Sequence, residues 1–405
     1  MKYVILIPDG AADYPIEELG NKTIFQAAEK PNIDSFAKSG RCGLLETVPE
    51  GFKPGSDVAN LSIMGYDAES YFPGGRGVIE AASMGIDVGG KDLPMRANII
   101  TVKDNNIIDY SADAITNEEA KALIAAANEA FGNEHFKFYP GVSYRNLLVL
   151  QDSGLKTEDL DFDAPHDHPN DPVKEHLCRG KSGLGKEWAE KLNDIMLKSQ
   201  EIFEKHPVNE QRRKDGRPLA NMLWLWGPGK LKKQFPTIQE KFGLNGTVIT
   251  GIDLIKGIGL LAGLKVVEVE GATAHYNTNF EGKADAAAVA LNSGDDMALV
   301  HVEAPDEAGH EGHIKEKVRA VENIDKRLLG RLIEKIEGEF RIGILPDHYT
   351  PISTRTHEMG RVPFLISGPG IEADDVEQFD EESVKSGGYG KVDGPKFIEL
   401  LVSKH

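Results

Sequence analysis

Aspartate and histidine side chains recur in short motifs at three distant places in this 405-residue chain, and each of these motifs follows an apolar run. The residues are Asp9, Asp306, His310, Asp347, His348 and His357. Carboxylates and imidazoles in combination suit Mn²⁺, Zn²⁺ or a similar ion. Six such ligands exceed what one metal with an open position needs, whereas a two-metal site stabilises both oxygens of a phosphoryl transfer. The pattern therefore predicts a two-metal phosphotransfer site.

Each of these residues has a simpler interpretation when taken alone. A single Asp after a strand is typical of a helix cap or a turn, and a lone His is more often a structural residue. The recurrence at three strand ends, with histidine added at close spacing, favours metal binding over these separate explanations.

Ser56, in the segment Lys53-Pro54-Gly55-Ser56-Asp57, is the candidate nucleophile. A serine at the start of a helix commonly caps it, which is the alternative interpretation. The positive end of a helix dipole and a nearby metal ion would both lower the pKa of the hydroxyl. Beside the metal-ligand motifs, we predict that Ser56 is the nucleophile.

The elements that position these residues are expected to form a parallel sheet. Residues 3–7, 298–302 and 340–345 are apolar runs of the kind that forms strands buried on both faces. Helical and strand segments alternate in the last third of the chain, which favours an α/β fold with helices on both faces. Further strands are predicted at 265–269 and 363–367, and helices at 23–30, 33–38, 56–64, 252–262, 283–291, 315–336 and 396–404. Ligands bind beyond the carboxyl ends of such strands.

The middle of the chain differs, and we predict that residues 96–235 form a smaller inserted α+β domain. Residues 1–95 and 236–405 would then form the metal-binding core. Within the insert, the expected strands are 97–102, 144–150 and 222–226, and the expected helices are 116–130 and 186–205. Residues 152–185 are expected to be loop, and 211–218 a charged turn.

Composition restricts the function further. The formal net charge of −19 argues against nucleic acid or an anionic membrane as the main partner. No apolar stretch is long enough for a signal peptide or a membrane span, and Cys42 and Cys178 allow one disulfide at most. We predict a cytoplasmic protein that acts on a small phosphorylated molecule, and the sequence leaves the oligomeric state open.

Several motifs together resemble those of the alkaline phosphatase superfamily, within it the archaeal-type 2,3-bisphosphoglycerate-independent phosphoglycerate mutases. The motifs are Pro8-Asp9-Gly10, Pro31-Asn32-Ile33-Asp34, Gly55-Ser56-Asp57, Gly75-Arg76-Gly77, Asp306-x-x-x-His310, Pro346-Asp347-His348, Thr356-His357, Gly271-Ala272-Thr273 and Asn279-Phe280-Glu281-Gly282-Lys283-Ala284. The resemblance implies an alkaline-phosphatase-like sheet sandwiched by helices, with the inserted domain acting as a lid over the substrate.

The resemblance also implies roles for individual residues. One metal would be bound by Asp9, Ser56, Asp347 and His348, and the second by Asp306, His310 and His357. Mn²⁺ is the first expectation, with Zn²⁺ or Mg²⁺ as alternatives. Ser56 would carry the phosphoryl group between the two hydroxyls of glycerate, and Lys283 would help to neutralise that group. A plain helix-face charge is the alternative interpretation of Lys283.

Two basic stretches that the resemblance implies are replaced here by Ile108-Asp109-Tyr110-Ser111-Ala112 and Leu225-Trp226-Gly227. The remaining candidates for substrate binding are Arg76, Arg96, Arg145 and His166. His166-Asp167-His168 is interpreted as loop or substrate contact rather than a third metal site. The replaced stretches keep open a related phosphotransferase, such as a homoserine kinase-like enzyme, and after it a plain phosphatase.

Overall fold

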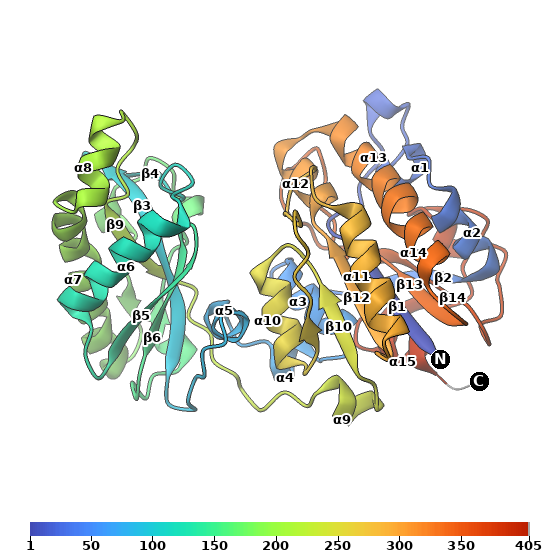
Figure 1. The fold of residues 1–405 in the computed structure, drawn as a ribbon, viewed down its shortest axis with the longest axis horizontal. Coiled ribbons are helices and arrows are strands. Elements are labelled where there is room, and N and C mark those ends of the chain that lie inside the picture. The colour runs from blue at the N-terminus through green and yellow to red at the C-terminus, as the bar shows by residue number, and fades with distance from the viewer. Residues whose placement is uncertain (404–405) are drawn as a thin grey trace. The chain divides into compact units, whose positions relative to one another are not determined.

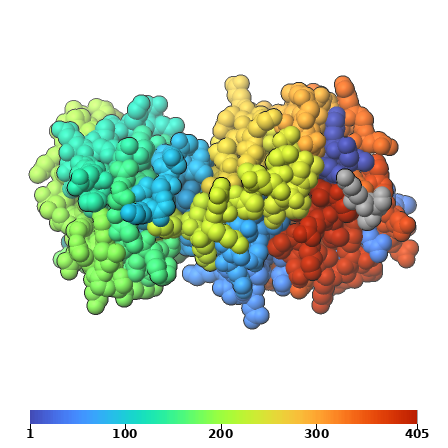
Figure 2. All heavy atoms as spheres, turned by 90° about the horizontal axis from the view of Figure 1, so that it is seen from below, coloured from blue at the N-terminus to red at the C-terminus, as the bar shows by residue number. Residues whose placement is uncertain are grey.

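The computed structural model describes residues 1–403, and the chain forms two compact units. Met1–Phe72 and Lys233–His405 form the first unit, into which Pro73–Lys232 is inserted as the second. Residues from both ends of the chain, blue and red in Figure 2, lie together on the surface of the first unit. No helix in the described part of the chain is long and apolar enough to cross a membrane.

The second unit begins at Pro73, earlier than the position 96 predicted from the sequence. The reason is helix α5 (Gly77–Ser83), which packs against strand β3 (Leu93–Lys103) of the same unit. The backbone N–H of Gly77 also donates to the carbonyl of Gly227 at 3.0 Å, which ties the start of the insertion to its end.

The first unit is built on an eight-stranded sheet of order β11-β10-β12-β1-β13-β14-β2-β15. Neighbouring strands are parallel except at β14, which runs antiparallel to both β13 and β2. The bounds are β1 Lys2–Pro8, β2 Gly40–Glu46, β10 Gly246–Ile249, β11 Lys265–Val266, β12 Met297–Val302, β13 Phe340–Ile344, β14 Val362–Ser367 and β15 Gly390–Asp393. The prediction of a mostly parallel sheet is confirmed.

Helices cover both faces of this sheet (Figure 1). Val4 and Leu6 of β1 share a core cluster with α2, α11, α13 and α14, and Ile5 and Ile7 are also fully buried. On the other face, α10 and α15 pack against the sheet, and α3 packs against both of these helices. The bounds are α1 Ile24–Ala27, α2 Pro31–Ser39, α3 Ser56–Ile63, α4 Ala68–Tyr71, α9 Ile238–Phe242, α10 Asp253–Leu261, α11 Phe280–Asn292, α12 Ala304–Glu311, α13 Ile314–Asn323, α14 Gly330–Lys335 and α15 Lys396–Val402. Because both faces are covered, the central strands are apolar throughout.

Three predicted elements of the first unit differ from the structure. The single helix expected over 315–336 contains a π-helical segment, Ile324–Leu329, in which Asp325 accepts hydrogen bonds from the backbone N–H groups of Asn32 and Ile33. The strand expected over 265–269 stops at Val266. The last helix ends at Val402, and Lys404 of its predicted range lies outside the described residues.

The second unit has an antiparallel sheet in which β3 pairs with β4, β6 and β9, and β6 pairs with β5. The bounds are β4 Asn106–Asp109, β5 Phe136–Val142, β6 Arg145–Leu150, β7 Leu160–Asp161, β8 Arg179–Gly180, β9 Met222–Trp226, α6 Asn117–Phe131, α7 Gly183–Glu204 and α8 Pro207–Lys214. Helix α6 agrees with the helix predicted over 116–130, and a capping box of Thr116 and Glu119 starts it. The expected turn over 211–218 is wrong, because α8 begins at Pro207, capped by His206, and occupies its first half.

Glu381, in the loop after β14, is a buried carboxylate whose pKa should make stability depend on pH. Its oxygens accept from Thr23 Oγ1 at 2.6 Å and from the backbone N–H of Asp13 at 3.0 Å. Burial raises its pKa from 4.5 to about 7. The unfolded chain ionises first as pH rises, so the stability that this group contributes at low pH is lost between about pH 4.5 and 7.

We expect wild type to lose on the order of 3 kcal/mol of unfolding free energy through Glu381 across this window. Glu381→Gln should remove that part of the pH dependence, as measured by urea unfolding between pH 4.5 and 8. Glu382→Gln, at the exposed neighbouring position, is the matched control and should retain it. Identical pH profiles for wild type and Glu381→Gln would contradict the assignment.

Candidate metal centre

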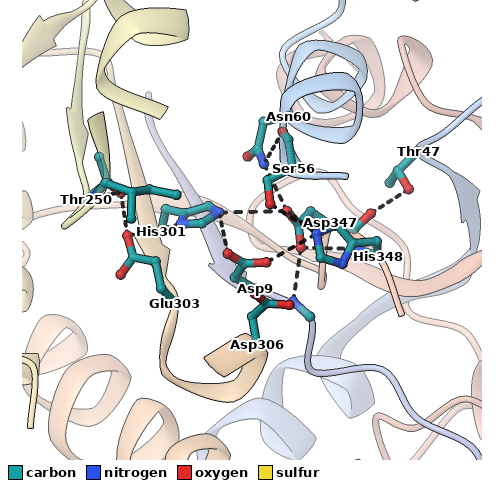
Figure 3. A network of polar contacts seen from close by, with 12 residues as sticks. Asp9, Thr47, Ser56, Asn60, Thr250, His301, Glu303, Asp306, Asp347 and His348 are labelled. Carbon is teal, nitrogen blue, oxygen red and sulfur yellow. Dashed lines mark hydrogen bonds and ion pairs between the residues drawn. The ribbon is translucent and has the colours of Figure 1, made fainter. Parts of the chain in front are cut away.

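Three adjacent strands deliver the predicted metal ligands to one edge of the sheet. Strands β12, β1 and β13 are neighbours and parallel, so their carboxyl ends meet. Asp9 follows β1, Asp347 and His348 follow β13, and α12 begins just after β12. Asp306 and His310 lie one helical turn apart on α12, so their side chains share a face. Figure 3 shows the residues of the first cluster from close by.

The first cluster consists of Asp9, Asp347 and His348, all buried, with ligand atoms within 4.8 Å of one another. His348 Nε2 lies 3.5 Å from both Asp9 Oδ1 and Asp347 Oδ2. The hydroxyl of Ser56 lies 3.0 Å from the same nitrogen. The side chains of Asp9, Ser56 and Asp347 therefore converge on His348 Nε2.

Ser56 is the first residue of α3, after an N-terminal cap formed by Gly55. No side-chain hydrogen bond caps this helix, so the alternative interpretation of Ser56 as the cap is wrong. Asn60, one turn later, donates both to the Ser56 carbonyl at 2.9 Å and to Asp347 Oδ2 at 3.0 Å. This amide ties the helix start to the first cluster.

Asp306, His310 and His357 form the second cluster. The Nε2 atoms of His310 and His357 lie 3.0 Å apart, and they lie 3.3 and 3.5 Å from the Asp306 oxygens. The rings of His357 and His348 have centroids 4.2 Å apart, so the two clusters adjoin. Thr350 Oγ1 bridges them, 2.5 Å from Asp306 Oδ1 and 3.2 Å from His348 Nδ1.

The charge balance of the clusters fits bound cations. Asp9 Oδ1 is buried and has no hydrogen-bond partner among the described residues. Burial, followed by the charges of Asp347 and Asp306, raises the pKa of Asp9 well above its usual range. Burying three carboxylates together is unfavourable without a compensating positive charge. The donor set and the adjoining clusters therefore fit divalent metal ions.

Lys283 lies behind the first cluster. It is fully buried, and its ammonium donates to Glu303 Oε2 at 2.9 Å and to the His301 carbonyl at 2.8 Å. Glu303 in turn lies 3.3 Å from His301 Nδ1, and His301 Nε2 faces Asp9 Oδ2 at 3.5 Å. Lys283 thus reaches Asp9 through two intervening side chains.

The sequence did not predict that His301 and Glu303 belong to the site. Both are fully or almost fully buried, and Thr250 also donates to Glu303 at 2.5 Å. The available signal was a histidine inside the otherwise apolar run of β12, directly before the Asp306 motif. A buried polar residue in such a strand needs a partner, which points toward the neighbouring site.

Two of the candidate substrate-binding residues, Arg96 and Arg145, form a cationic face with Asn98 and Trp226 on the sheet of the second unit. Arg96 and Asn98 alternate on β3, opposite Trp226 of β9 and Arg145 of β6 respectively, so all four side chains share one face. The Arg96 guanidinium lies 4.9 Å from the Trp226 ring centre and 2.9 Å from Glu80. Both polar side-chain atoms of Asn98, Arg145 Nε and Trp226 Nε1 are buried and have no hydrogen-bond partner within residues 1–403.

His166 joins this face from the loop after β7. Its ring contacts Trp226 at 5.2 Å and Tyr110 at 5.8 Å between centroids. Burial, and then the positive charges of Arg76 and Arg96, lower the pKa of His166. The structure therefore brings Arg96, Arg145 and His166 to one face, and Arg76 acts on His166 through its charge. Asn98 was not predicted, since an asparagine inside a strand carries no motif.

Known proteins resemble this chain over its whole length. It is 47% identical to a 2,3-bisphosphoglycerate-independent phosphoglycerate mutase of Methanosarcina acetivorans, covering 99% of this chain and 100% of the relative. It is 46% identical to the Methanothrix thermoacetophila protein of the same name, with full coverage of both. The family model described as 2,3-bisphosphoglycerate-independent phosphoglycerate mutase matches residues 37–209.

A solved structure agrees with these relatives. The cofactor-independent phosphoglycerate mutase of Thermoplasma acidophilum superimposes with a TM-score of 0.64 at 26% identity, covering 99% of each chain. The fold, the convergence of the motif residues and the identity of the relatives all agree. The chain belongs to the family of 2,3-bisphosphoglycerate-independent phosphoglycerate mutases.

Proposed function

We propose that this chain interconverts 3-phosphoglycerate and 2-phosphoglycerate, with Ser56 as the phosphoryl carrier. The observation that carries the proposal is the Ser56 hydroxyl, 3.0 Å from His348 Nε2 at the meeting point of two ligand clusters. The relatives at 46–47% identity that bear the mutase name support the substrate. The enzyme is an isomerase because the phosphoryl group returns to the same glycerate.

Ser56 loses its proton and attacks the phosphorus of 3-phosphoglycerate, and the bond between phosphorus and the 3-oxygen breaks. The freed glycerate oxygen takes up a proton, and the glycerate re-orients within the site. Its 2-hydroxyl then attacks the phosphoserine, which regenerates Ser56 and releases 2-phosphoglycerate. The start of α3 favours the negative charge that develops on Ser56.

Two divalent ions, with Mn²⁺ as the first expectation, would supply positive charge for the transferring phosphoryl group and would lower the pKa of the attacking hydroxyl. Asp9, Ser56, Asp347 and His348 would hold one ion, and Asp306, His310 and His357 the other. His301 holds Asp9 in position, and Lys283 neutralises Glu303 behind it. Lys283 thus contributes positive charge to the site through Glu303 and His301.

The cationic face of the second unit binds the acidic substrate. Arg145 and Asn98 offer polar atoms that have no partner in the described part of the chain to a carboxylate or phosphate, and Arg96, paired with Glu80, adds positive charge beside them. Trp226 occupies the place of an arginine expected from the family resemblance and holds the Arg96 guanidinium by stacking. Closure of this unit as a lid, and a location in the cytoplasm, stay predictions.

The metal-loaded protein, incubated with 3-phosphoglycerate, should form 2-phosphoglycerate and release little inorganic phosphate. The reaction is followed by ³¹P NMR, which separates the two esters from free phosphate. Removal of the metals by a chelator should stop it, and Mn²⁺ should restore it. Phosphorylation of homoserine without isomerisation would instead favour a kinase-like enzyme, and phosphate release alone would favour a phosphatase.

A further inference from the structure

A second kind of ligand cluster lies in the second unit, in the segment between β7 and β8. The rings of His168 and His176 stack with centroids 3.7 Å apart and planes at 26°. Asp171 Oδ2 lies 3.2 Å from His168 Nδ1 and 3.3 Å from His176 Nε2. Ligand atoms of Asp163, His168 and His176 lie within 4.8 Å of one another. One short loop segment therefore gathers two imidazoles and two carboxylates.

This arrangement fits a bound cation better than a set of ion pairs. His168 Nδ1 and His176 Nε2 both face the same carboxylate oxygen of Asp171, at 3.2 and 3.3 Å. Two imidazole nitrogens and a carboxylate oxygen gathered this closely are the donor types of a zinc-class site.

The surroundings of His176 resemble the support that metal-binding histidines usually have. Its second ring nitrogen, Nδ1, lies 2.9 Å from Asp163 Oδ2. Arg179 holds both oxygens of that carboxylate, at 2.9 and 3.0 Å. A carboxylate bound to one ring nitrogen fixes the tautomer and leaves the other nitrogen, here Nε2, as the ligand.

We propose that His168, His176 and Asp171 bind a divalent ion of the zinc class, separate from the two clusters of the first unit. Two imidazoles and one carboxylate, with a fourth position for water, match zinc coordination. The sequence interpretation grouped His166 with His168, but the structure separates them. His166 contacts Trp226, and His168 turns to His176.

The ion would stabilise the loop that places His166 against the cationic face. The loop backbone already docks on β4, where Asn170 N–H donates to the Ile107 carbonyl at 2.7 Å and Val173 N–H to the Asn105 carbonyl at 2.9 Å. The proposed ligand His168 lies next to these bonds and two residues after His166. Metal binding at His168 therefore keeps His166 in contact with Trp226. The role is one of positioning, because the ion would act on the cationic face through the chain connection between His168 and His166.

Zinc stoichiometry of the full chain tests the proposal. Wild-type protein saturated with Zn²⁺ and desalted should retain three ions per chain by plasma mass spectrometry, and His176→Ala should retain two. His135→Ala, at a half-exposed histidine of the same unit, is the matched control and should retain three. Two ions in wild type, or three in His176→Ala, would overturn the proposal.

A second experiment distinguishes loss of the third site from misfolding of His176→Ala. The double variant Asp306→Asn with Asp347→Asn should still bind one Zn²⁺, and this ion should disappear when His168→Ala is added. Trypsin cleavage after Lys174 and Lys181 should slow about tenfold on adding Zn²⁺ to the double variant, because the closed loop must open to be cut. No remaining zinc in the double variant, or zinc-independent cleavage, would refute the third site.

Discussion

Ser56→Ala should lower the rate of phosphoglycerate isomerisation at least ~10⁴-fold while the protein keeps both of its ions in the first unit. The alanine side chain has no hydroxyl oxygen to carry the phosphoryl group, so the covalent step is lost. The six remaining ligand residues are untouched, and His348 and Asp347 keep their backbone and Asn60 contacts. The measurement is the initial rate by coupled assay, together with metal content by plasma mass spectrometry.

Ser62→Ala is the matched control for this experiment, since Ser62 is a buried serine in the same helix α3. Its hydroxyl has no hydrogen-bond partner in the described structure, so removing it should change the rate by no more than about twofold. Residual isomerisation of Ser56→Ala near the wild-type rate would remove Ser56 from the mechanism. Loss of metal together with activity would show that Ser56 acts mainly as a ligand.

Asp347→Asn should cost about 10³-fold or more in rate, with the loss of one of the two ions in the first unit. Asp347 is fully buried, and Oδ1 accepts from the backbone N–H groups of Gly10 and His348 at 3.1 and 3.0 Å. Asparagine can keep these bonds through its carbonyl oxygen but turns an amide group toward Asn60 and the ligand cluster. The negative charge that fits the cation is lost, whereas the fold persists.

Asp285→Asn provides the matched comparison, because Asp285 is a partly exposed carboxylate of the same unit paired with Arg331 and Lys335. It should retain wild-type activity and metal content, because exposed ion pairs contribute little. The ion that remains in Asp347→Asn should depend on Asp306, so that adding Asp306→Asn releases it. Retention of both ions by Asp347→Asn would contradict the assignment of the first cluster.

The convergence of the metal-ligand motifs was predictable because it follows from topology. Apolar runs that are buried on both faces form neighbouring parallel strands, and the residues just after β1, β12 and β13 then meet at one edge. The assignment of Ser56 came from its motif beside these ligands. Its contact with His348 depends on the path of the chain between β2 and α3, which no local pattern describes.

Other features were unpredictable for different physical reasons. Strands β10 and β15 are only four residues long, and their pairing comes from neighbours far away in the sequence. The His301–Glu303–Lys283 chain joins a residue of β12, the residue before α12 and a residue of α11, which acquire their roles only when they are buried together. Helix α8 is strongly polar, and its buried Arg212 is satisfied by Glu119 and by distant carbonyls.

By itself, the sequence determined the class of fold and predicted the ligand residues and the nucleophile, because apolar periodicity and metal-ligand chemistry are local properties of residue type and spacing. Only the tertiary structure decided how these groups are distributed in space. It divided the ligands into two adjoining clusters, placed Lys283 behind Glu303, and separated His166 from His168. The reason is that distances between side chains far apart in the chain depend on strand order and packing, which no single segment encodes.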